Sequence, residues 1–294
     1  MSHVRILIDY RPALRERTGV GEYVHQLARA LALQRVDRSG ERRAGDRRAS
    51  VNADDVEVFS SSWRDRPRPD AVADLGSRVT VNDCHIPVRL LNAAWHRLGW
   101  PPVEWLTGRR YDVVHSPHPL LMPSRRAARL ITIHDLDFLL HPEHTTAEVR
   151  RDYGGLVRKH AARADGVIVS SQYAADLVST TLGVDPDRIA LCPAGVPEWR
   201  TDRPVVPGNT AGRYVLFVGT LEARKNVGRL LDAWRLILDS RPDVPPLVLA
   251  GRSTPAAGPW LTALARAPLT GRVEYRGYVP STERQTLYEG ARLL

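Results

Sequence analysis

Short runs of consecutive apolar residues alternate along this chain with longer segments in which apolar residues recur every three or four positions. The runs are typical of strands buried on both faces of a parallel sheet, and the spaced pattern is typical of amphipathic helices. The predicted strands cover residues 4–9, 56–60, 78–81, 111–115, 129–133, 166–170, 188–192, 214–218, 246–250 and 272–277. The predicted helices cover residues 22–33, 88–100, 145–162, 171–182 and 260–266, with two more beginning near residues 227 and 281. This alternation predicts an α/β fold with parallel sheets, in which ligands bind at the carboxyl ends of the strands.

A change of composition at residues 193–213 divides the chain. This stretch is rich in Pro and Gly and lacks periodicity, so we predict a linker between an N-terminal domain at residues 1–192 and a C-terminal domain at residues 214–294. In the second domain the pattern provides three strands and then a final helix carrying Leu287, Ala291 and Leu294. Three strands make an incomplete sheet for a doubly wound domain. We therefore expect the chain to be a truncated form of a longer protein, without one wall of its ligand crevice.

The chain is strongly basic, with a formal charge of +9 and a pI near 10.0. Much of the basic density lies at residues 35–48, where acids are mixed with the arginines and aromatic residues are absent. We interpret this stretch as a solvated loop and expect no nucleic-acid partner. A nucleic-acid binder is the alternative, and its affinity would fall steeply with salt. The positive charge also suits anionic lipid headgroups, so peripheral contact with a membrane is a further hypothesis.

Two sequence features bear on location. No run approaches the roughly 18 apolar residues that a membrane span needs, and the N-terminus enters a predicted strand directly instead of forming a secretory signal. Cys84 and Cys192 are too few for a disulfide framework or a zinc site, so we expect reduced thiols. These features predict a cytoplasmic protein, and the charge hypothesis would place it at the inner face of the membrane.

The stretch with the most specific chemistry follows the strand at residues 214–218. Gly219 ends this strand, and Asn226 is predicted to cap the next helix. Arg224 and Lys225 therefore lie just ahead of a helix N-terminus, where free backbone N–H groups and the helix dipole favour a diphosphate. A solvated basic loop is the alternative. Lys159 and Lys225 are the only lysines of the chain, so a lysine at this position is not simply what an arginine-rich composition would supply.

The first strand is also followed by a glycine-bearing turn. Gly19 and Gly21 precede the helix at residues 22–33, which makes a strand, a turn and a helix, the first half of a βαβ unit. These glycines either let the backbone approach a ligand closely or simply fit a tight turn, and the pattern leaves both interpretations open.

Polar residues follow two other predicted strands of the first domain. His115, His118, His134 and Asp135 lie at or just past predicted strand ends, where ligands of parallel sheets bind. A lone histidine near a strand end is more often a hydrogen-bonded structural residue, and we favour this interpretation for His115 and His118. His134 and Asp135 are the stronger candidates for function.

Taken together, these segments resemble the retaining glycosyltransferases of family four, which fold as two facing Rossmann-like domains (GT-B). The segment G-T-L-E-A-R-K-N is similar to the one that holds the donor diphosphate in that family. The segment I-T-I-H-D-L-D is similar to the loop that places a histidine near the donor sugar, directly followed by an aspartate. The residues that match the family's donor-binding segments are Gly19, Gly21, Gly219, Glu222, Arg224, Lys225 and Asn226, and those that match its catalytic loop are His134 and Asp135.

The resemblance implies a GT-B fold of two Rossmann-like domains facing a cleft, the second of them incomplete. It further implies transfer of a hexose from a nucleotide diphosphate sugar to a sugar or lipid-linked acceptor, with retention of configuration, in polysaccharide or glycolipid biosynthesis. Mannosyl-type members carry similar segments, so the expected donor is GDP-mannose. In this interpretation His134 positions the sugar, Asp135 orients the loop or the acceptor, and Arg224 and Lys225 stabilise the leaving diphosphate without a metal ion or a cofactor.

Three other functions remain open at this stage. The missing end of the second domain makes a non-catalytic nucleotide-sugar-binding remnant an alternative. A sugar-nucleotide epimerase or a phosphorylase on the same two-domain plan is the enzymatic alternative. A phosphorylase would need a lysine that holds a pyridoxal cofactor, whereas Lys159 lies within a predicted helix and Lys225 is already assigned to the diphosphate.

Overall fold

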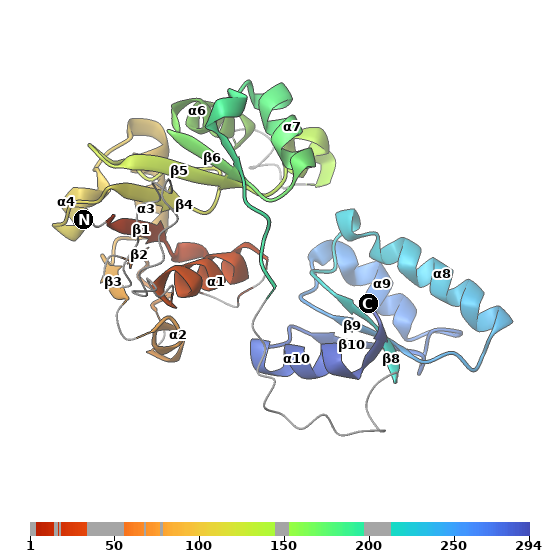
Figure 1. The fold of residues 1–294 in the computed structure, drawn as a ribbon. Coiled ribbons are helices and arrows are strands. Elements are labelled where there is room, and N and C mark those ends of the chain that lie inside the picture. Colours follow the sequence, from red (N-terminus) through yellow and green to blue (C-terminus); the bar gives the residue numbers. More distant parts are fainter. Residues whose placement is uncertain are drawn as a thin grey trace, which may run out of the picture. The chain divides into compact units, whose positions relative to one another are not determined.

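The computed structural model describes residues 4–14, 17, 19–33, 56–67, 69–76, 79–144, 153–196 and 213–294. The chain divides into two compact units, residues 1–196 and 197–294, and the predicted α/β class with parallel sheets is confirmed in both (Figure 1). The arginine-rich stretch at residues 35–48 and residues 197–212 of the predicted linker lie outside the described residues. Both cysteines are free, as expected.

The first unit is built on a seven-stranded sheet with the strand order β3-β2-β1-β4-β5-β6-β7, and all neighbouring strands are parallel (Figure 1). The strands are β1 (Ile6–Asp9), β2 (Val56–Ser60), β3 (Thr80–Asp83), β4 (Val113–Ser116), β5 (Ala128–Ile133), β6 (Gly166–Val169) and β7 (Ile189–Leu191). The order reverses between β1 and β4, since β1 to β3 extend one way and β4 to β7 the other. This reversal is where doubly wound sheets bind ligands.

Helices cover both faces of this sheet. They are α1 (Val20–Leu33), α2 (Pro69–Asp74), α3 (Val88–Ala93), the π-helical turn η3 (Ala94–Leu98), α4 (Val103–Thr107), α5 (Asp137–Leu140), α6 (Gly154–Arg163) and α7 (Gln172–Leu182). Successive side chains of a strand point to opposite faces, so Ile8 packs with Val24 of α1 while Leu7 packs in a separate core with Trp95 of η3. A buried face on each side explains why the strands appear as continuous apolar runs in the sequence.

The second unit contains a four-stranded parallel sheet with the order β10-β9-β8-β11. Its elements are β8 (Tyr214–Val218), α8 (Val227–Ser240), β9 (Leu247–Ala250), α9 (Gly258–Leu264), β10 (Val273–Gly277), α10 (Ser281–Gly290) and β11 (Ala291–Leu293). In this unit the order reverses between β8 and β11.

The prediction for the end of the chain was wrong. The last helix ends at Gly290, and the residues expected to continue it form β11, which pairs with β8 and gives the sheet a fourth strand. Tyr214 explains this end, because its hydroxyl donates a hydrogen bond of 2.8 Å to the carbonyl of Leu287 and would lie 2.7 Å from a Cβ at position 290. A larger residue at that position would have to displace the Tyr214 side chain.

Three smaller predictions also differ from the structure. The helix expected at residues 88–100 ends as α-helix at Ala93, continues as η3 and stops at Gly99, whose φ is 65°. The third strand lies at Thr80–Asp83, two residues later than expected, and His115 lies inside β4 and not beyond its end. The short helices α2, α4 and α5 were not predicted, since four to six residues carry too little periodicity to be recognised.

Candidate functional site

Each unit has one candidate site, at the carboxyl ends of the strands where the strand order reverses. In the second unit this edge carries the loop that follows β8, next to β11. In the first unit it carries the segments that follow β1, β4 and β5. The predicted site residues divide between these two edges.

The loop after β8 is a short 3-10 turn leading into α8. Ala223–Lys225 form the turn, and Asn226 follows in the left-handed conformation with a φ of 55°. Asn226 occupies the N-cap position, but its side chain makes no capping hydrogen bond, so the capping role predicted for it was wrong. Asparagine is one of the few residues that adopt this conformation at low cost, and its carbonyl accepts the first intrahelical bond, from the amide of Leu230 at 3.0 Å. The amides that precede Leu230 in α8 have no carbonyl of their own helix to bind.

Two cations lie beside these amides. The Arg224 guanidinium contacts the Glu222 carboxylate at 2.8 Å, and both side chains are partly exposed. The side chain of Lys225 is exposed and contacts no acid within the described ranges. Positive side chains and the positive end of the α8 dipole therefore coincide, which favours a ligand with several negative charges.

The loop that follows β9 supports this segment from one side. A Cβ at Gly251, whose φ is +150°, would lie 1.9 Å from the carbonyl oxygen of Gly219. The amide of Leu221 donates to the carbonyl of Arg252 at 2.8 Å, and the hydroxyl of Thr254 donates to the carbonyl of Leu221 at 2.8 Å. The backbone after β8 is thus held in place by the backbone after β9, and the approach is close enough to exclude any side chain at position 251.

In the first unit, a buried ion pair lies at the reversal between β1 and β4. Asp9 is fully buried, and both its oxygens accept hydrogen bonds from the Arg11 guanidinium, at 2.8 and 2.6 Å. Arg11 also donates to Asn92 at 2.8 Å and stacks over the Trp95 ring at 4.8 Å. Burial by itself would raise the pKa of Asp9, but the Arg11 guanidinium and the hydrogen bonds from Arg11 and His118 outweigh it and hold the pKa far below its usual range.

His118 extends this network across the reversal. Its Nδ1 accepts a hydrogen bond from the amide of Leu120 at 3.2 Å, so Nε2 is the nitrogen that carries hydrogen and donates to Asp9 at 2.9 Å. His118 is expected from the sequence to be structural, and neither Asp9 nor Arg11 is among the predicted site residues. Asp9 could have been predicted from the sequence, because it ends the first apolar run. It therefore lies at the carboxyl end of a strand, which is the criterion that identified His134.

His134 lies beside this network, just past β5. One ring nitrogen bonds to the carbonyl of Pro117, while Nε2 is buried and has no hydrogen-bond partner among the described residues. The Tyr23 ring meets the imidazole edge to face at 4.7 Å between centroids. Burial is the main cause that lowers the pKa of His134, so the imidazole is neutral at neutral pH and Nε2 presents a lone pair. A buried acceptor without a partner is suited to a hydroxyl group of a ligand.

The other candidates of the first unit have local structural functions in the described part of the chain. The carboxylate of Asp135 accepts a hydrogen bond from the amide of Asp137 at 3.2 Å, at the start of α5. His115 is buried and bonds to the Thr132 hydroxyl at 2.8 Å, and burial lowers its pKa to about 4. A Cβ at Gly21 would lie 2.7 Å from the carbonyl oxygen of Pro12, so close packing of α1 explains this glycine. Gly19 is exposed and has a φ of 40°, which explains it as a turn residue.

The described residues contain no cluster of three or more His, Cys, Asp or Glu side chains arranged to hold a metal ion. None of the helices in the described ranges combines the length and the apolar character that crossing a bilayer requires.

Comparison with known families places both units in one kind of enzyme. The family described as "Glycosyltransferase Family 4" matches residues 47–200, and the family described as "Glycosyl transferases group 1" matches residues 212–294. The two matches meet close to the boundary between the two units. The segments that follow β4, β5 and β8 therefore lie within the matched glycosyltransferase regions, whereas β1 and the residues after it precede the first match.

Individual proteins agree with this assignment. The chain is 26% identical to the O-antigen chain mannosyltransferase B of Escherichia coli, over 98% of the chain and 75% of that protein. The crystal structure of WaaG, a glycosyltransferase involved in lipopolysaccharide biosynthesis, is similar with a TM-score of 0.63 and 13% identity, over 98% of this chain and 73% of WaaG. Anabaena Alr3699/HepE in complex with UDP and glucose is similar with a TM-score of 0.53 and 15% identity, over 94% of this chain and 70% of that protein. These likenesses establish a GT-B-like, Rossmann-like fold.

Proposed function

The chain belongs to glycosyltransferase family 4, and from this premise we propose that it transfers a hexose from a nucleotide diphosphate sugar to a sugar or lipid-linked acceptor, with retention of configuration. The O-antigen mannosyltransferase relative favours mannose as the sugar and GDP-mannose as the donor. It also favours an acceptor from polysaccharide or glycolipid synthesis. The observation that carries the proposal is the pair of cations at the N-terminus of α8, beside the strand-order reversal of the second unit.

The donor diphosphate binds, in this proposal, to the segment at residues 219–226. Arg224, Lys225 and the first amides of α8 face the phosphates, and Glu222 orients the Arg224 guanidinium through their 2.8 Å contact. Transfer breaks the bond between the sugar C1 and the diphosphate oxygen, and the diphosphate leaves with the electron pair. The cations stabilise the negative charge that develops on it, which is an electrostatic role that requires no protein nucleophile.

The sugar end is assigned to His134. Its neutral Nε2 accepts a hydrogen bond from a sugar hydroxyl, which provides the buried nitrogen with the partner it lacks within the described residues. The bond to the Pro117 carbonyl and the edge contact with Tyr23 fix the ring in one orientation. Asp135 orients the loop through the Asp137 amide. Gly19 and Gly21 are assigned to donor binding on the family resemblance alone, since the turn and the packing of α1 already account for both glycines.

Calorimetry with GDP-mannose and UDP-glucose tests the diphosphate assignment. Arg224→Ala and Lys225→Ala should each weaken binding of the accepted donor about 10- to 100-fold, because each removes a charge-assisted contact. Arg241→Ala is the matched control, since Arg241 is an exposed cation at the opposite end of α8 and should leave affinity unchanged. Equal affinity of all three variants and the wild type would remove the basis of the proposal.

Assays of turnover separate the alternatives. A transferase releases nucleoside diphosphate only when an acceptor is present, and NMR of the product's anomeric centre reports retention or inversion. A sugar-nucleotide epimerase converts the donor without any acceptor. A binding remnant shows donor affinity but leaves the donor unchanged under both conditions.

A further inference from the structure

Three large apolar side chains lie exposed on one part of the first unit. Leu98 is 76% exposed, Trp100 is 54% exposed and Trp105 is 58% exposed. The two tryptophan rings meet edge to face with centroids 6.1 Å apart, so they form one continuous aromatic surface. Large apolar residues grouped on a surface in this way mark a site of interaction.

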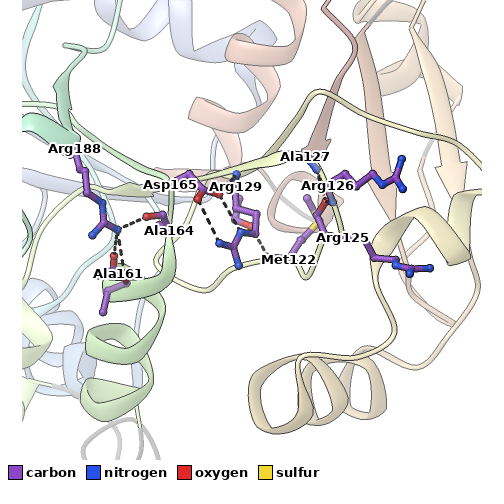
Figure 2. A network of polar contacts seen from close by, with 12 residues as sticks. Met122, Arg125, Arg126, Ala127, Arg129, Ala161, Ala164, Asp165 and Arg188 are labelled. Atoms are coloured by element: carbon purple, nitrogen blue, oxygen red, sulfur yellow. Dashed lines mark hydrogen bonds and ion pairs between the residues drawn. The ribbon is translucent and has the colours of Figure 1, made fainter.

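Three exposed arginines are neighbours of these side chains, one in space and two in the sequence. The Arg125 guanidinium lies 5.9 Å from the centre of the Trp105 ring, Arg126 is its neighbour in the chain, and Arg97 precedes Leu98. Figure 2 shows Arg125 and Arg126 directed away from the nearby ion pair of Arg129 and Asp165. We call the surface formed by Leu98, Trp100, Trp105, Arg97, Arg125 and Arg126 the Trp–Arg face.

These arginines lack the acidic partners that other exposed arginines of the unit have. Arg109 pairs with Glu57 and Arg129 pairs with Asp165, whereas the guanidinium groups of Arg97, Arg125 and Arg126 form no ion pair with a described residue. The only acid at residues 85–110, Glu104, accepts hydrogen bonds from Ser124 and from the amide of Arg125. The Trp–Arg face therefore presents apolar surface and uncompensated positive charge together.

We infer that the Trp–Arg face docks on an anionic lipid bilayer. Tryptophan favours the boundary between headgroups and acyl chains, and arginine binds anionic headgroups, so the two residue types fit a bilayer surface together. A protein partner with a matching acidic and apolar surface is the competing occupant. The basic charge of the sequence suggested a membrane contact, and the Trp–Arg face is the surface that would make it. Docking of this face does not depend on donor binding.

The same helical segment connects the Trp–Arg face to the first-unit site. Leu98 ends η3 on the exposed side, while Trp95 of η3 and Asn92 of α3 contact Arg11 on the buried side. Arg11 in turn holds Asp9 at the reversal of the sheet. A bilayer bound at the Trp–Arg face would therefore contact the same helical segment that supports the Asp9–Arg11 ion pair from its buried side.

Flotation with lipid vesicles tests the inference, without nucleotide in the mixture. The wild type should float with vesicles of equal parts phosphatidylcholine and phosphatidylglycerol and stay behind with pure phosphatidylcholine. The double variant Arg125→Glu and Arg126→Glu should bind at least fivefold more weakly for each arginine removed, as expected from about 1 kcal/mol per basic residue. The double variant Trp100→Ser and Trp105→Ser should also lose binding.

Matched controls exist elsewhere in the chain. Trp63 is 73% exposed and follows β2, whereas the residues of the Trp–Arg face precede β4 and β5, so Trp63→Ser should float like the wild type. Arg229→Glu with Arg241→Glu makes the same charge change in the second unit and should have a smaller effect. Circular dichroism checks that each variant is folded.

Three outcomes would overturn the inference. The first is a wild type that floats with neither kind of vesicle, and the second is equal flotation of the Trp–Arg face variants and the controls. The third is a dimer in sedimentation velocity that the Trp100→Ser and Trp105→Ser changes dissociate, which would assign the face to a second copy of the chain. None of these outcomes depends on donor binding, so they leave the proposed transferase function to its own test.

Discussion

Asp9 and His118, which are 109 residues apart in the sequence, share a hydrogen bond of 2.9 Å between carboxylate and imidazole. The bond joins the residue that ends β1 to the segment that follows β4, the two strands between which the sheet order reverses. Pro117, next to His118, accepts the hydrogen bond of His134. The network therefore fixes the backbone on which His134 depends.

Replacement of Asp9 by Asn should destabilise the first unit strongly. Arg11 is 9% exposed and would be left as a buried cation without a carboxylate, which costs about 3–5 kcal/mol. Urea unfolding of the two proteins measures this difference. Asp165→Asn is the control, because the Asp165–Arg129 pair is partly exposed and such pairs contribute about 1 kcal/mol or less. If both variants lost the same free energy of unfolding, burial would not be the reason that the Asp9–Arg11 pair matters for stability.

Replacement of His134 by Ala should lower kcat/KM about 10- to 100-fold while the affinity for free nucleoside diphosphate stays unchanged. The reason is that His134 is assigned to the sugar hydroxyl and not to the phosphates. Steady-state kinetics and calorimetry give the two values. Tyr23→Phe retains the ring that contacts His134 and should be nearly as active as the wild type. A loss of diphosphate affinity in His134→Ala would instead indicate a structural role.

Replacement of Gly251 by Ala should damage the donor site of the second unit. The added methyl group would lie 1.9 Å from the Gly219 carbonyl, so the loops after β8 and β9 must separate. We expect a lower melting temperature and loss of donor binding, measured by thermal unfolding and calorimetry. Gly258→Ala is the control, because a Cβ at that position, the first residue of α9, meets no atom within 4 Å. Alanine there should be neutral or slightly stabilising.

Acid should destabilise the first unit through its buried histidines. Burial lowers the pKa of His115 to about 4. Below about pH 6.5 the unfolded chain therefore binds a proton at His115 while the folded protein does not, which favours unfolding. This contribution is absent above pH 6.5 and grows as the pH falls toward 4, where the folded form also binds the proton. Asp9 acts in a lower range, since its pKa is already below its usual range and its stabilisation is lost only as the pH falls below about 4.

His115→Gln isolates this effect. As the pH falls from about 6.5 to about 5, the free energy of unfolding should decrease by about 2 kcal/mol less in the variant than in the wild type. The size follows because one pKa unit corresponds to about 1.4 kcal/mol. Urea unfolding at the two pH values gives the comparison. His160 and His96, whose pKa values are also lowered to about 4 mainly by burial, should account for much of the remaining loss. Equal pH dependence of variant and wild type would refute the assignment to His115.

Removal of divalent cations should leave turnover unchanged, since Arg224 and Lys225 are proposed to stabilise the leaving diphosphate. Initial rates with and without EDTA test this expectation. Asp135 and Asp137 are separated by one residue and carry the oxygen ligands that Mg²⁺ prefers, so a metal-dependent reaction is the specific alternative. Asp137→Asn is informative in that case, because it would weaken any cation stimulation.

The fold class was predictable because its signal is local. The continuous apolar run at residues 214–218 and the spaced apolar positions from residue 227 identify β8 and α8 without knowledge of any distant residue. The same local pattern brought Arg224 and Lys225 to a strand end before a helix. The local pattern did not predict β11, because a strand of three residues is too short to show a periodicity. This strand is defined by its pairing with β8.

By itself the sequence determined two parallel α/β units and the residues at the ends of their strands, because side-chain periodicity and turn residues act over a few positions. Tertiary structure decided which of these residues meet: Asp9 with Arg11 and His118, His134 with the Pro117 carbonyl, and Gly251 with Gly219. It also decided that the Nε2 atom of His134 is buried without a partner in the described part of the chain, while Lys225 stays exposed. Burial and long-range hydrogen bonds arise only when distant segments pack, and they are what set the charge state and the accessibility of each group.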